Sequence, residues 1–477
     1  MRSRAAFVLL FAAVLAARLT HSGIVWVEEG YPLAAALQML GGKALYRDIW
    51  FDKPPLSACA YVLFGAATGW PLRLAGAVFV TLCCWLIYRL GATLWGQREG
   101  LVAAALLAFY LTFGIPSAVM ALAPDLLMVA PHIAAVWLAA LRRPAWSGLA
   151  AGIAFLANAK GIFVLAACLA WNPAGALWTL AGFAFPVAVQ LALLDTQGAL
   201  TSYWIQVWDW GFTYSGRTFV EHPLREGVVR MLSWAGFQAT AVLAAVYLWW
   251  KERQSSPAKL LAWALISIVG VAAGWRFFPR YYFQLLPVVA LAGARGLCLM
   301  PRKYVVVLLA LLAVPLVRFG PRYVQLAVGD TPWRDLAMSN DSRQAASLLK
   351  AMAQPGDTLL VWGYRPDIYA LTRLPAGSRF LDSQPLTGVL ADRHLTHSDV
   401  LYPAIAAHNR GELVTTQPAL LVDGLGPYNP KLAIGTFDDL RPWLNDYQEF
   451  ARTPGCVLYR RKPTAPSSMA PASPKTR

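Results

Sequence analysis

Long apolar runs alternate with short charged turns through the first two thirds of the chain. The runs span roughly 16–23 residues, the length that an α-helix needs to cross about 30 Å of hydrocarbon. From about Asp330 the runs disappear and the chain turns polar. The pattern therefore predicts a polytopic α-helical membrane domain of about eleven spans, followed by one soluble domain. The predicted spans cover residues 5–20, 72–94, 99–114, 122–141, 146–158, 161–172, 174–194, 229–250, 259–275, 281–299 and 303–319.

Composition and charge lead to the same class. Of 477 residues, 58% are hydrophobic and 14% are charged, which is more apolar surface than a soluble domain can bury. The net charge is +16. With the N-terminus in the cytoplasm, the basic residues gather in the predicted cytoplasmic turns, as the positive-inside rule requires. We therefore attribute the charge to membrane topology and not to nucleic-acid binding. The basic residues in the predicted cytoplasmic turns are Arg89, Arg98, Arg142, Arg143, Lys251, Arg253, Lys259, Arg295, Arg302 and Lys303.

This topology places both the loop at 21–71 and the C-terminal domain on the extracytoplasmic side. Residues 56–68 are apolar enough to span, but an extra span would move the later basic turns outside. We therefore expect a helix that lies in, or dips into, the outer interface. The N-terminal segment carries Arg2 and Arg4 but ends without a clear small-x-small cleavage site, so we keep it as the first span.

The loop at 21–71 holds an unusual set of charges for a membrane boundary. Glu28 and Glu29 follow the first span closely, and Asp48 and Asp52 come later in the same loop. Asp125 stands at the outer end of the fourth span. Ionisable groups at such a boundary are candidates for a functional site. The structural alternative is a solvated loop with acids that cap helices, each worth about 0.3–1 kcal/mol.

Basic residues gather at the same boundary. Lys53 precedes two prolines that begin the next helix, and Lys160 lies in a predicted outer turn. Arg276 and Arg280, followed by Tyr281, stand outside against the positive-inside trend. Snorkelling and an aromatic belt explain them without a function. An anionic partner such as a lipid phosphate explains them with one.

These residues together resemble the GT-C fold glycosyltransferases that use polyprenyl-phosphate sugars. The nearest groups are bacterial relatives of the protein O-mannosyltransferases and of the lipid A aminoarabinose transferase. The resemblance covers roughly the first 320 residues and only weakly the C-terminal domain. The motifs that carry it are Glu28-Glu29, Tyr46-Arg47-Asp48, Asp52-Lys53-Pro54-Pro55, Asp125, Ala159-Lys160-Gly161, Arg280-Tyr281 and Leu286-Pro287.

The resemblance implies an inverting, single-displacement transfer of a hexose or pentose from a lipid phosphate to a hydroxyl. One carboxylate would accept the proton, and cations would stabilise the leaving phosphate. The family usually has Asp where this chain has Glu28, so the choice of base between Glu28 and Glu29 stays open. We expect Glu28, Glu29 and Asp125 to be catalytic, with Asp48 and Asp52 as further acidic candidates. Donor phosphate would be bound by Lys53, Lys160, Arg276, Arg280 and Tyr281.

The sequence shows no sign of a required cofactor. It has no CxxC, HExxH or clustered histidines for a metal site of soft ligands, and a divalent metal is left open. It also has no GxGxxG or Gly-rich phosphate loop, which fits a donor carried on lipid and not on a nucleotide. The expected partners are the donor lipid, membrane lipids and an acceptor that is a glycan, a lipid or a protein.

We predict a catalytic membrane domain over 1–325, an extracytoplasmic α/β domain over 335–462 and a disordered tail over 463–477. In the α/β domain we expect a helix at 342–352, strands at 358–362 and 419–423, a helix at 440–447 and a strand at 456–460. We expect acceptor recognition from this domain. The tail is rich in Pro, Ser and Ala.

A transporter or flippase for lipid-linked sugars is the main alternative. Membrane content, interfacial charges and a phosphate-binding patch would suit it as well. A transporter more often has an internal repeat and charged or broken helices near mid-membrane, whereas these charges stand at the outer boundary. We therefore favour the enzyme, placed in the bacterial inner membrane. The sugar, the acceptor and the oligomeric state stay open.

Overall fold

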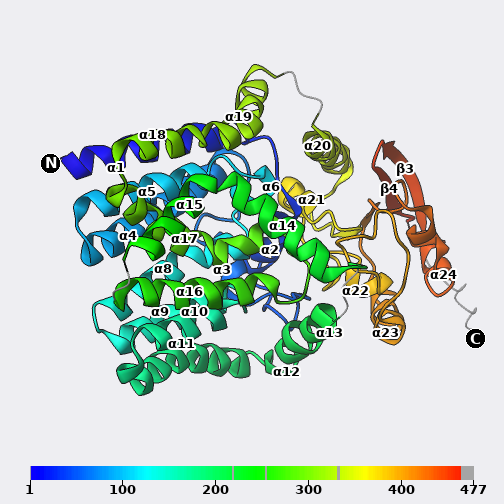
Figure 1. The fold of residues 1–477 in the computed structure, drawn as a ribbon. Helices are drawn as coiled ribbons and strands as arrows, with labels where there is room; N and C mark the ends of the chain where they lie inside the picture. The colour runs from blue at the N-terminus through cyan, green and yellow to red at the C-terminus, as the bar shows by residue number, and fades with distance from the viewer. Residues whose placement is uncertain (1, 217–219, 253–254, 330–332, 464–477) are drawn as a thin grey trace, which may run out of the picture. The chain divides into compact units, whose positions relative to one another are not determined.

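The computed structural model describes residues 2–216, 220–252, 255–329 and 333–463. The chain divides into two compact units, which we describe separately. The first comprises residues 1–343 together with 365–373, and the second comprises 344–364 together with 374–477. Helices make up the first unit, and the second contains the four strands β1 to β4 (Figure 1). The predicted disordered tail lies outside the described residues apart from Pro463.

The first unit follows the predicted order of apolar segments. Its opening helices are α1 (Arg2–Leu19), α2 (Val27–Leu40), α3 (Leu56–Val62), α4 (Trp70–Leu94), α5 (Gln97–Tyr110), α6 (Pro116–Val119), α7 (Pro124–Leu127), α8 (Val129–Ala140), α9 (Pro144–Ala157), α10 (Gly161–Trp171) and α11 (Ala176–Thr196). Those that follow are α12 (Leu200–Tyr203), α13 (Trp210–Gly216), α14 (Pro223–Phe237), α15 (Ala239–Lys251), α16 (Ser255–Ala272), α17 (Leu286–Leu299), α18 (Arg302–Ala310), α19 (Ala313–Val328) and α21 (Asp367–Thr372). Between them lie the π-helical η2 (Trp204–Asp209) and the 3₁₀ segments η1 (Pro173–Gly175) and η3 (Pro279–Gln284).

Several of these helices are long and apolar enough to cross a membrane. Three segments within the described residues meet that test: Trp70–Leu94, Pro173–Thr196 and Arg302–Val328. Five further apolar helices are shorter, with 10–17 residues. The helices lie where the sequence predicts spans, and the count of eleven stays a prediction.

One predicted span is not a single helix. The sequence predicts a continuous helix over 229–250, but α14 and α15 meet at Gln238 with a bend of 94°. No proline lies at the break; Gly236 and the polar Ser233 and Gln238 interrupt the apolar run there. Such a break is tolerated in a membrane only where the freed backbone lines a cavity or meets other protein groups.

The loop predicted at 21–71 is also more structured than expected. It contains α2, which is buried from Glu29 to Gln38, and the seven-residue α3. The helix α3 begins after Pro54 and Pro55, as predicted, and is far too short to span. The sequence does not predict α2, because its buried positions fill every face instead of one stripe.

The short helix α9 packs closely against α11. A methyl group at Gly148 of α9 would overlap the carbonyl of Thr179 in α11. In the same way, one at Gly182 would overlap the carbonyl of Ala145. Small residues let the two backbones approach, which is how helices associate in lipid. The predicted turn between α9 and α10 is confirmed, since the Lys160 N–H donates to Asn158 Oδ1 at 3.0 Å.

The second unit is a small α/β fold. Its sheet has the order β1-β2-β4-β3, with β1 (Leu359–Trp362) parallel to β2 (Leu420–Asp423). The pair β4 (Cys456–Arg461) and β3 (Tyr447–Thr453) forms an antiparallel hairpin. Its helices are α22 (Gln384–Thr387), α23 (Pro403–Leu413) and α24 (Arg441–Leu444), with η4 (Pro430–Leu432) and η5 (Ile434–Thr436). The helix α20 (Arg334–Met352) runs from the first unit into this one.

The strand predictions for this unit are confirmed for β1, β2 and β4. The helix predicted at 440–447 is wrong beyond Leu444, because Tyr447 begins β3, which the sequence analysis missed. The signal for this hairpin was Pro454-Gly455, a turn pair between two short runs. The strand was hard to recognise because most of its side chains are polar or partly exposed.

Candidate functional site

Glu28, Asp125 and Arg280 come together at the centre of the candidate site. Glu28 lies in the first turn of α2, and its Oε1 accepts a hydrogen bond from Arg280 Nη1 at 2.8 Å. The Nε of the same guanidinium lies 3.4 Å from Asp125 Oδ2. Arg280 comes from η3 and Asp125 from α7, so three distant segments meet here. All three residues were predicted as site residues.

The charge on Arg280 is held in place by its surroundings. Its guanidinium carbon lies 4.9 Å from the ring centroid of Phe278 and 5.9 Å from that of Tyr281. Burial alone would lower the pKa of Arg280, but the carboxylates of Glu28 and Asp125 reverse this and keep it above its usual value. The site therefore has a permanent cation between two carboxylates.

Lys160 adds a second cation to the cluster. Its Nζ lies 3.0 Å from the ring centroid of Tyr281. Within the described residues, this Nζ is buried and has no hydrogen-bond partner. Burial lowers the pKa of Lys160 to about 7, although the carboxylate of Asp125 opposes the shift. A lysine amine in this position can exchange its proton near neutral pH.

Glu29 has a different environment from its neighbour Glu28. Its side chain is fully buried and forms an ion pair with Arg73 of α4. It also accepts hydrogen bonds from the backbone N–H groups of Trp26 at 3.3 Å and Leu122 at 3.1 Å. Glu29 thereby joins α2 to the segment that leads into Asp125.

Two buried arginines that sequence reasoning missed hold the same segment. Arg73 donates to the carbonyl of Met120 at 2.7 Å, and Arg18 donates to Met120 at 2.9 Å and to Val119 at 2.5 Å. Each arginine side chain is 1% exposed. The available signal was a charged residue at the end of an apolar run, which is costly in lipid unless it has partners.

The predicted acidic residues Asp48 and Asp52 form a separate group. Asp48 pairs with Arg47 at 2.9 Å, and hydrogen bonds from Arg47 keep the pKa of Asp48 below its usual value. Asp52 pairs with Lys53 at 3.2 Å, and the Lys53 side chain is 39% exposed. Among the described residues, Asp48 and Asp52 thus pair with Arg47 and Lys53, whereas Glu28 and Asp125 both pair with Arg280.

Arg276 is largely occupied by protein groups. Its guanidinium carbon lies 3.6 Å from the ring centroid of Tyr214, and its Nη2 donates to the Tyr214 carbonyl at 3.0 Å. Its own carbonyl accepts a hydrogen bond from Arg230 Nη1 at 2.7 Å. The side chain is 1% exposed, so Arg276 reaches less solvent than Arg280.

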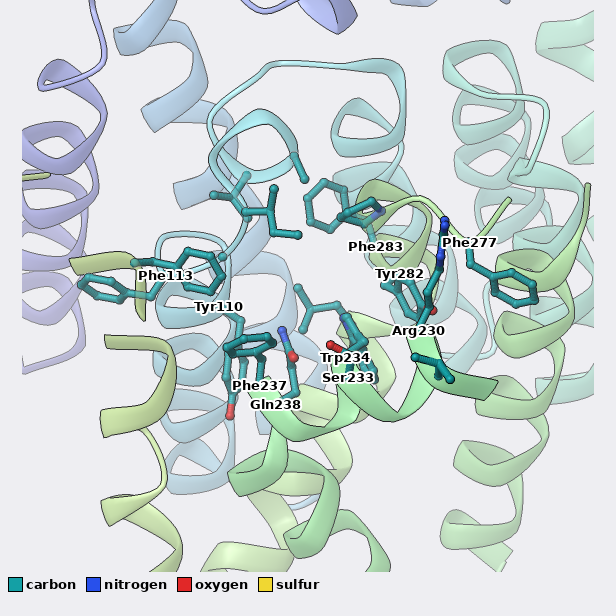
Figure 2. Close-up of a pocket in the computed structure, with 18 residues that line it drawn as sticks. Tyr110, Phe113, Arg230, Ser233, Trp234, Phe237, Gln238, Phe277, Tyr282 and Phe283 are labelled. Carbon is teal, nitrogen blue, oxygen red and sulfur yellow. The ribbon is translucent and has the colours of Figure 1, made fainter. Parts of the chain in front are cut away.

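A cavity of about 340 Å³ lies beside η3, at the bend between α14 and α15. Figure 2 shows aromatic side chains gathered around it, with Gln238 at the bend. Pro279, the residue before Arg280, belongs to its lining, which ties the cavity to the charged site. The side chains that dominate the lining are Tyr110, Phe113, Trp234, Phe237, Phe277 and Tyr282, with Arg230 and Gln238 as polar members.

Among the residues that the structure describes, no three His, Cys, Asp or Glu side chains gather closely enough to hold an ion. At the centre of the site, Glu28 and Asp125 share the guanidinium of Arg280.

The chain is similar to known proteins in part of its sequence and in its fold. Residues 52–194 match the family model described as dolichyl-phosphate-mannose-protein mannosyltransferase. No curated protein sequence matches the chain.

The fold is similar to that of ArnT from Cupriavidus metallidurans. The structure of ArnT bound to undecaprenyl phosphate aligns over 96% of this chain and 99% of that one, with a TM-score of 0.59 and 15% identity. The apo structure of ArnT aligns over 96% and 98%, with a TM-score of 0.55 and 15% identity. The resemblance predicted from the sequence is therefore confirmed: this chain has the fold of the GT-C glycosyltransferases, and its residues 52–194 carry the sequence pattern of the mannosyltransferase family model.

Proposed function

We propose that this chain is an integral membrane glycosyltransferase that moves a sugar from a polyprenyl-phosphate donor to a hydroxyl acceptor on the extracytoplasmic face. The observation that carries the proposal is the pair of contacts that Arg280 makes with Glu28 and Asp125. A carboxylate that can accept a proton and a cation that can receive a phosphate lie within 2.8 Å of each other. Sugar transfer from a lipid phosphate needs both groups.

In the proposed reaction the acceptor hydroxyl oxygen attacks the anomeric carbon in a single inverting displacement. The bond between that carbon and the phosphate oxygen breaks, and the phosphate leaves with the electron pair. The hydroxyl proton passes to the base. Positive charge that develops on the sugar ring is stabilised by a nearby carboxylate. Glu28 is our choice of base, with Asp125 orienting the acceptor or stabilising that charge.

The two adjacent glutamates differ in a way that favours Glu28. The Glu28 side chain is 26% exposed, so a substrate can reach it, whereas the Glu29 side chain is 0% exposed and already accepts several hydrogen bonds. We therefore assign Glu29 the role of positioning Glu28 and Asp125. It acts with Arg73 and Arg18, which bind the same segment.

Arg280 would change partners during the reaction. An incoming phosphate competes with Glu28 for the guanidinium, because both are oxyanions that match its donors. Transfer of those hydrogen bonds to the phosphate leaves Glu28 free to take the acceptor proton. Lys160, Lys53 and Tyr281 would complete the phosphate site. Arg276 would support it through its stack on Tyr214.

The aromatic cavity suits the hydrocarbon part of the donor next to its phosphate. Its lining is mainly aromatic, and it lies beside η3, which carries Arg280. ArnT, whose fold is similar, has been solved with undecaprenyl phosphate bound.

The remaining parts of the proposal concern location and acceptor. We propose the eleven-span topology in a bacterial inner membrane, with a cytoplasmic N-terminus and an extracytoplasmic C-terminal domain that recognises the acceptor. The domain limits are those predicted from the sequence, 1–325 and 335–462. The acidic residues Asp48 and Asp52 would align Lys53 and the loop around it.

The test uses the purified chain with a polyprenyl-phosphate sugar. Transfer of the sugar to acceptors, or slow hydrolysis without one, is followed by mass spectrometry of the lipid. Glu28→Gln keeps the size of the side chain and removes the proton acceptor, and loss of a general base costs about 10²–10⁴ in rate. Glu449→Gln, at an exposed ion pair on β3, is the matched control and should keep full activity.

Two results would overturn the proposal. If each of the single variants Glu28→Gln, Glu29→Gln and Asp125→Asn keeps full transfer activity, the site is elsewhere. Movement of the lipid across a vesicle membrane, with the bond between sugar and phosphate intact, would favour the transporter.

A further inference from the structure

We propose that Gln206 is a positioning residue for donor binding, which acts by holding the turn at 46–51 that leads into Lys53. The proposal rests on the function proposed above, because it takes Lys53 as a ligand of the donor phosphate. No motif of the sequence points to Gln206, which lies in a segment dominated by aromatic residues.

Gln206 makes two hydrogen bonds to the backbone of one turn. Its Nε2 donates to the carbonyl of Tyr46 at 2.8 Å, and its Oε1 accepts from the N–H of Phe51 at 2.8 Å. The side chain is 1% exposed. A primary amide is well matched to this task, because one end donates and the other accepts. Gln206 therefore spans the turn from its first residue to its last.

The turn needs such a support because its backbone is strained. Tyr46 has a φ of 68°, in the left-handed region that non-glycine residues rarely adopt. Strained backbone persists only where the surroundings hold it. The Tyr46 hydroxyl in turn donates to the carbonyl of Lys53 at 2.8 Å. A continuous path of contacts thus runs from Gln206 through Tyr46 to Lys53.

The helix that carries Gln206 is itself irregular. Gln206 lies in η2, a π-helical stretch between α12 and α13. Such segments are frequent at functional sites. Trp204 and Ile205 on the same segment are 56% and 46% exposed, in contrast to Gln206. The segment thus presents apolar side chains outward and one amide inward.

The experiment measures the dissociation constant of undecaprenyl phosphate for the purified full-length chain. Gln206→Leu removes both hydrogen bonds at similar size. If Lys53 no longer meets the phosphate, the loss of a hydrogen bond to a charged group predicts roughly 10- to 100-fold weaker binding. Gln197→Leu is the matched control: this side chain is exposed in the same part of the chain, and the hydrogen bonds of Gln197 with Leu193 and Arg47 use its backbone. The control should bind like the wild type.

A double-mutant cycle separates positioning from a general structural effect. If Gln206 acts through Lys53, then Gln206→Leu should have little further effect on binding in a Lys53→Ala background. Gln206→Glu provides a second readout. An ionised glutamate can accept from Phe51 but cannot donate to Tyr46, whereas the protonated acid can do both. The affinity of Gln206→Glu for undecaprenyl phosphate, divided by the wild-type affinity at the same pH, should therefore recover as the pH falls from about 8 to about 5.

The outcomes are distinct. If Lys53→Ala binds the lipid like the wild type, the assignment of Lys53 as a phosphate ligand is wrong and this inference with it. If Lys53→Ala weakens binding but Gln206→Leu does not, or if the two effects multiply, only the role of Gln206 is wrong. Should Gln206→Leu fail to fold, the pH response of Gln206→Glu decides, and a flat ratio would overturn the inference.

Discussion

Glu29 and Arg73 form an ion pair in which neither side chain is more than 1% exposed. The preceding residue, Glu28, pairs instead with Arg280, and there each side chain is about a quarter exposed. Two consecutive residues of α2 thus carry a buried carboxylate and a solvent-accessible one. The acidic pair that stands out in the sequence therefore combines a buried, paired carboxylate with an accessible one.

This difference predicts opposite phenotypes for the two glutamates. Glu29→Ala leaves Arg73 buried without its partner, and breaking a buried ion pair on one side costs about 3–5 kcal/mol. Its thermal unfolding in detergent should therefore begin at a clearly lower temperature. Glu28→Gln should unfold like the wild type and lose transfer activity. A Glu29→Ala protein that is as stable as the wild type but inactive would instead make Glu29 the base.

The pKa of Lys160 predicts how donor binding depends on pH. Burial lowers this pKa to about 7, so the ammonium is mostly charged at pH 6 and mostly neutral at pH 8. A phosphate prefers the charged form, and the KM for a polyprenyl-phosphate sugar should therefore rise as the pH increases through 7. The donor phosphate is a diester and does not titrate in this range, so the change can be assigned to the protein.

Two variants check this assignment. Lys160→Arg keeps its charge throughout and should give a KM that hardly changes between pH 6 and pH 8. Lys160→Met should bind weakly at every pH. If the wild type and Lys160→Arg share one pH profile, Lys160 does not titrate during donor binding.

The cavity beside η3 predicts that filling it weakens donor binding. Ser233 of α14 lines the cavity, and Ser233→Trp would occupy space that the donor hydrocarbon needs. Overpacking costs about 1–3 kcal/mol, which corresponds to roughly 5- to 150-fold in affinity. Ala235→Trp, on the same helix but outside the lining, is the control. Equal affinities for the two variants would place the donor hydrocarbon elsewhere.

The sequence predicts the members of the site better than their partners. Glu28, Asp125 and Arg280 could be selected because each is an ionisable residue at the same predicted membrane boundary, which brings distant segments to one level. Because all three residues are predicted at the same depth relative to the membrane, contacts among them are possible. The buried partners could not be selected in this way: Gln206 lies in a segment rich in aromatic residues, and no motif marks it. Only the tertiary fold shows which backbone groups its amide meets.

The same limit applies to the helices. Apolar runs located the helices of the first unit, because runs of that length can cross the hydrocarbon as helices. It did not distinguish a straight helix from the bend at Gln238, and it did not predict α2. Both features depend on contacts between segments, which no local pattern of apolar residues encodes.

The last prediction concerns the topology, on which the sidedness of the site depends. With a cytoplasmic N-terminus and eleven spans, fusion reporters should place residues 40 and 400 outside and residues 96 and 143 inside. The physical reason is the concentration of arginines at Arg89, Arg98, Arg142 and Arg143, which the positive-inside rule keeps in the cytoplasm. The structure gives α3 only seven residues, so it should not add a span between residues 40 and 96 that would reverse this order. Reporters that find residues 143 and 400 on the same side of the membrane would contradict the eleven-span arrangement. If residues 143 and 400 are both inside while residue 40 is outside, the C-terminal domain lies on the opposite side of the membrane from Glu28, and acceptor recognition by that domain would have to be abandoned.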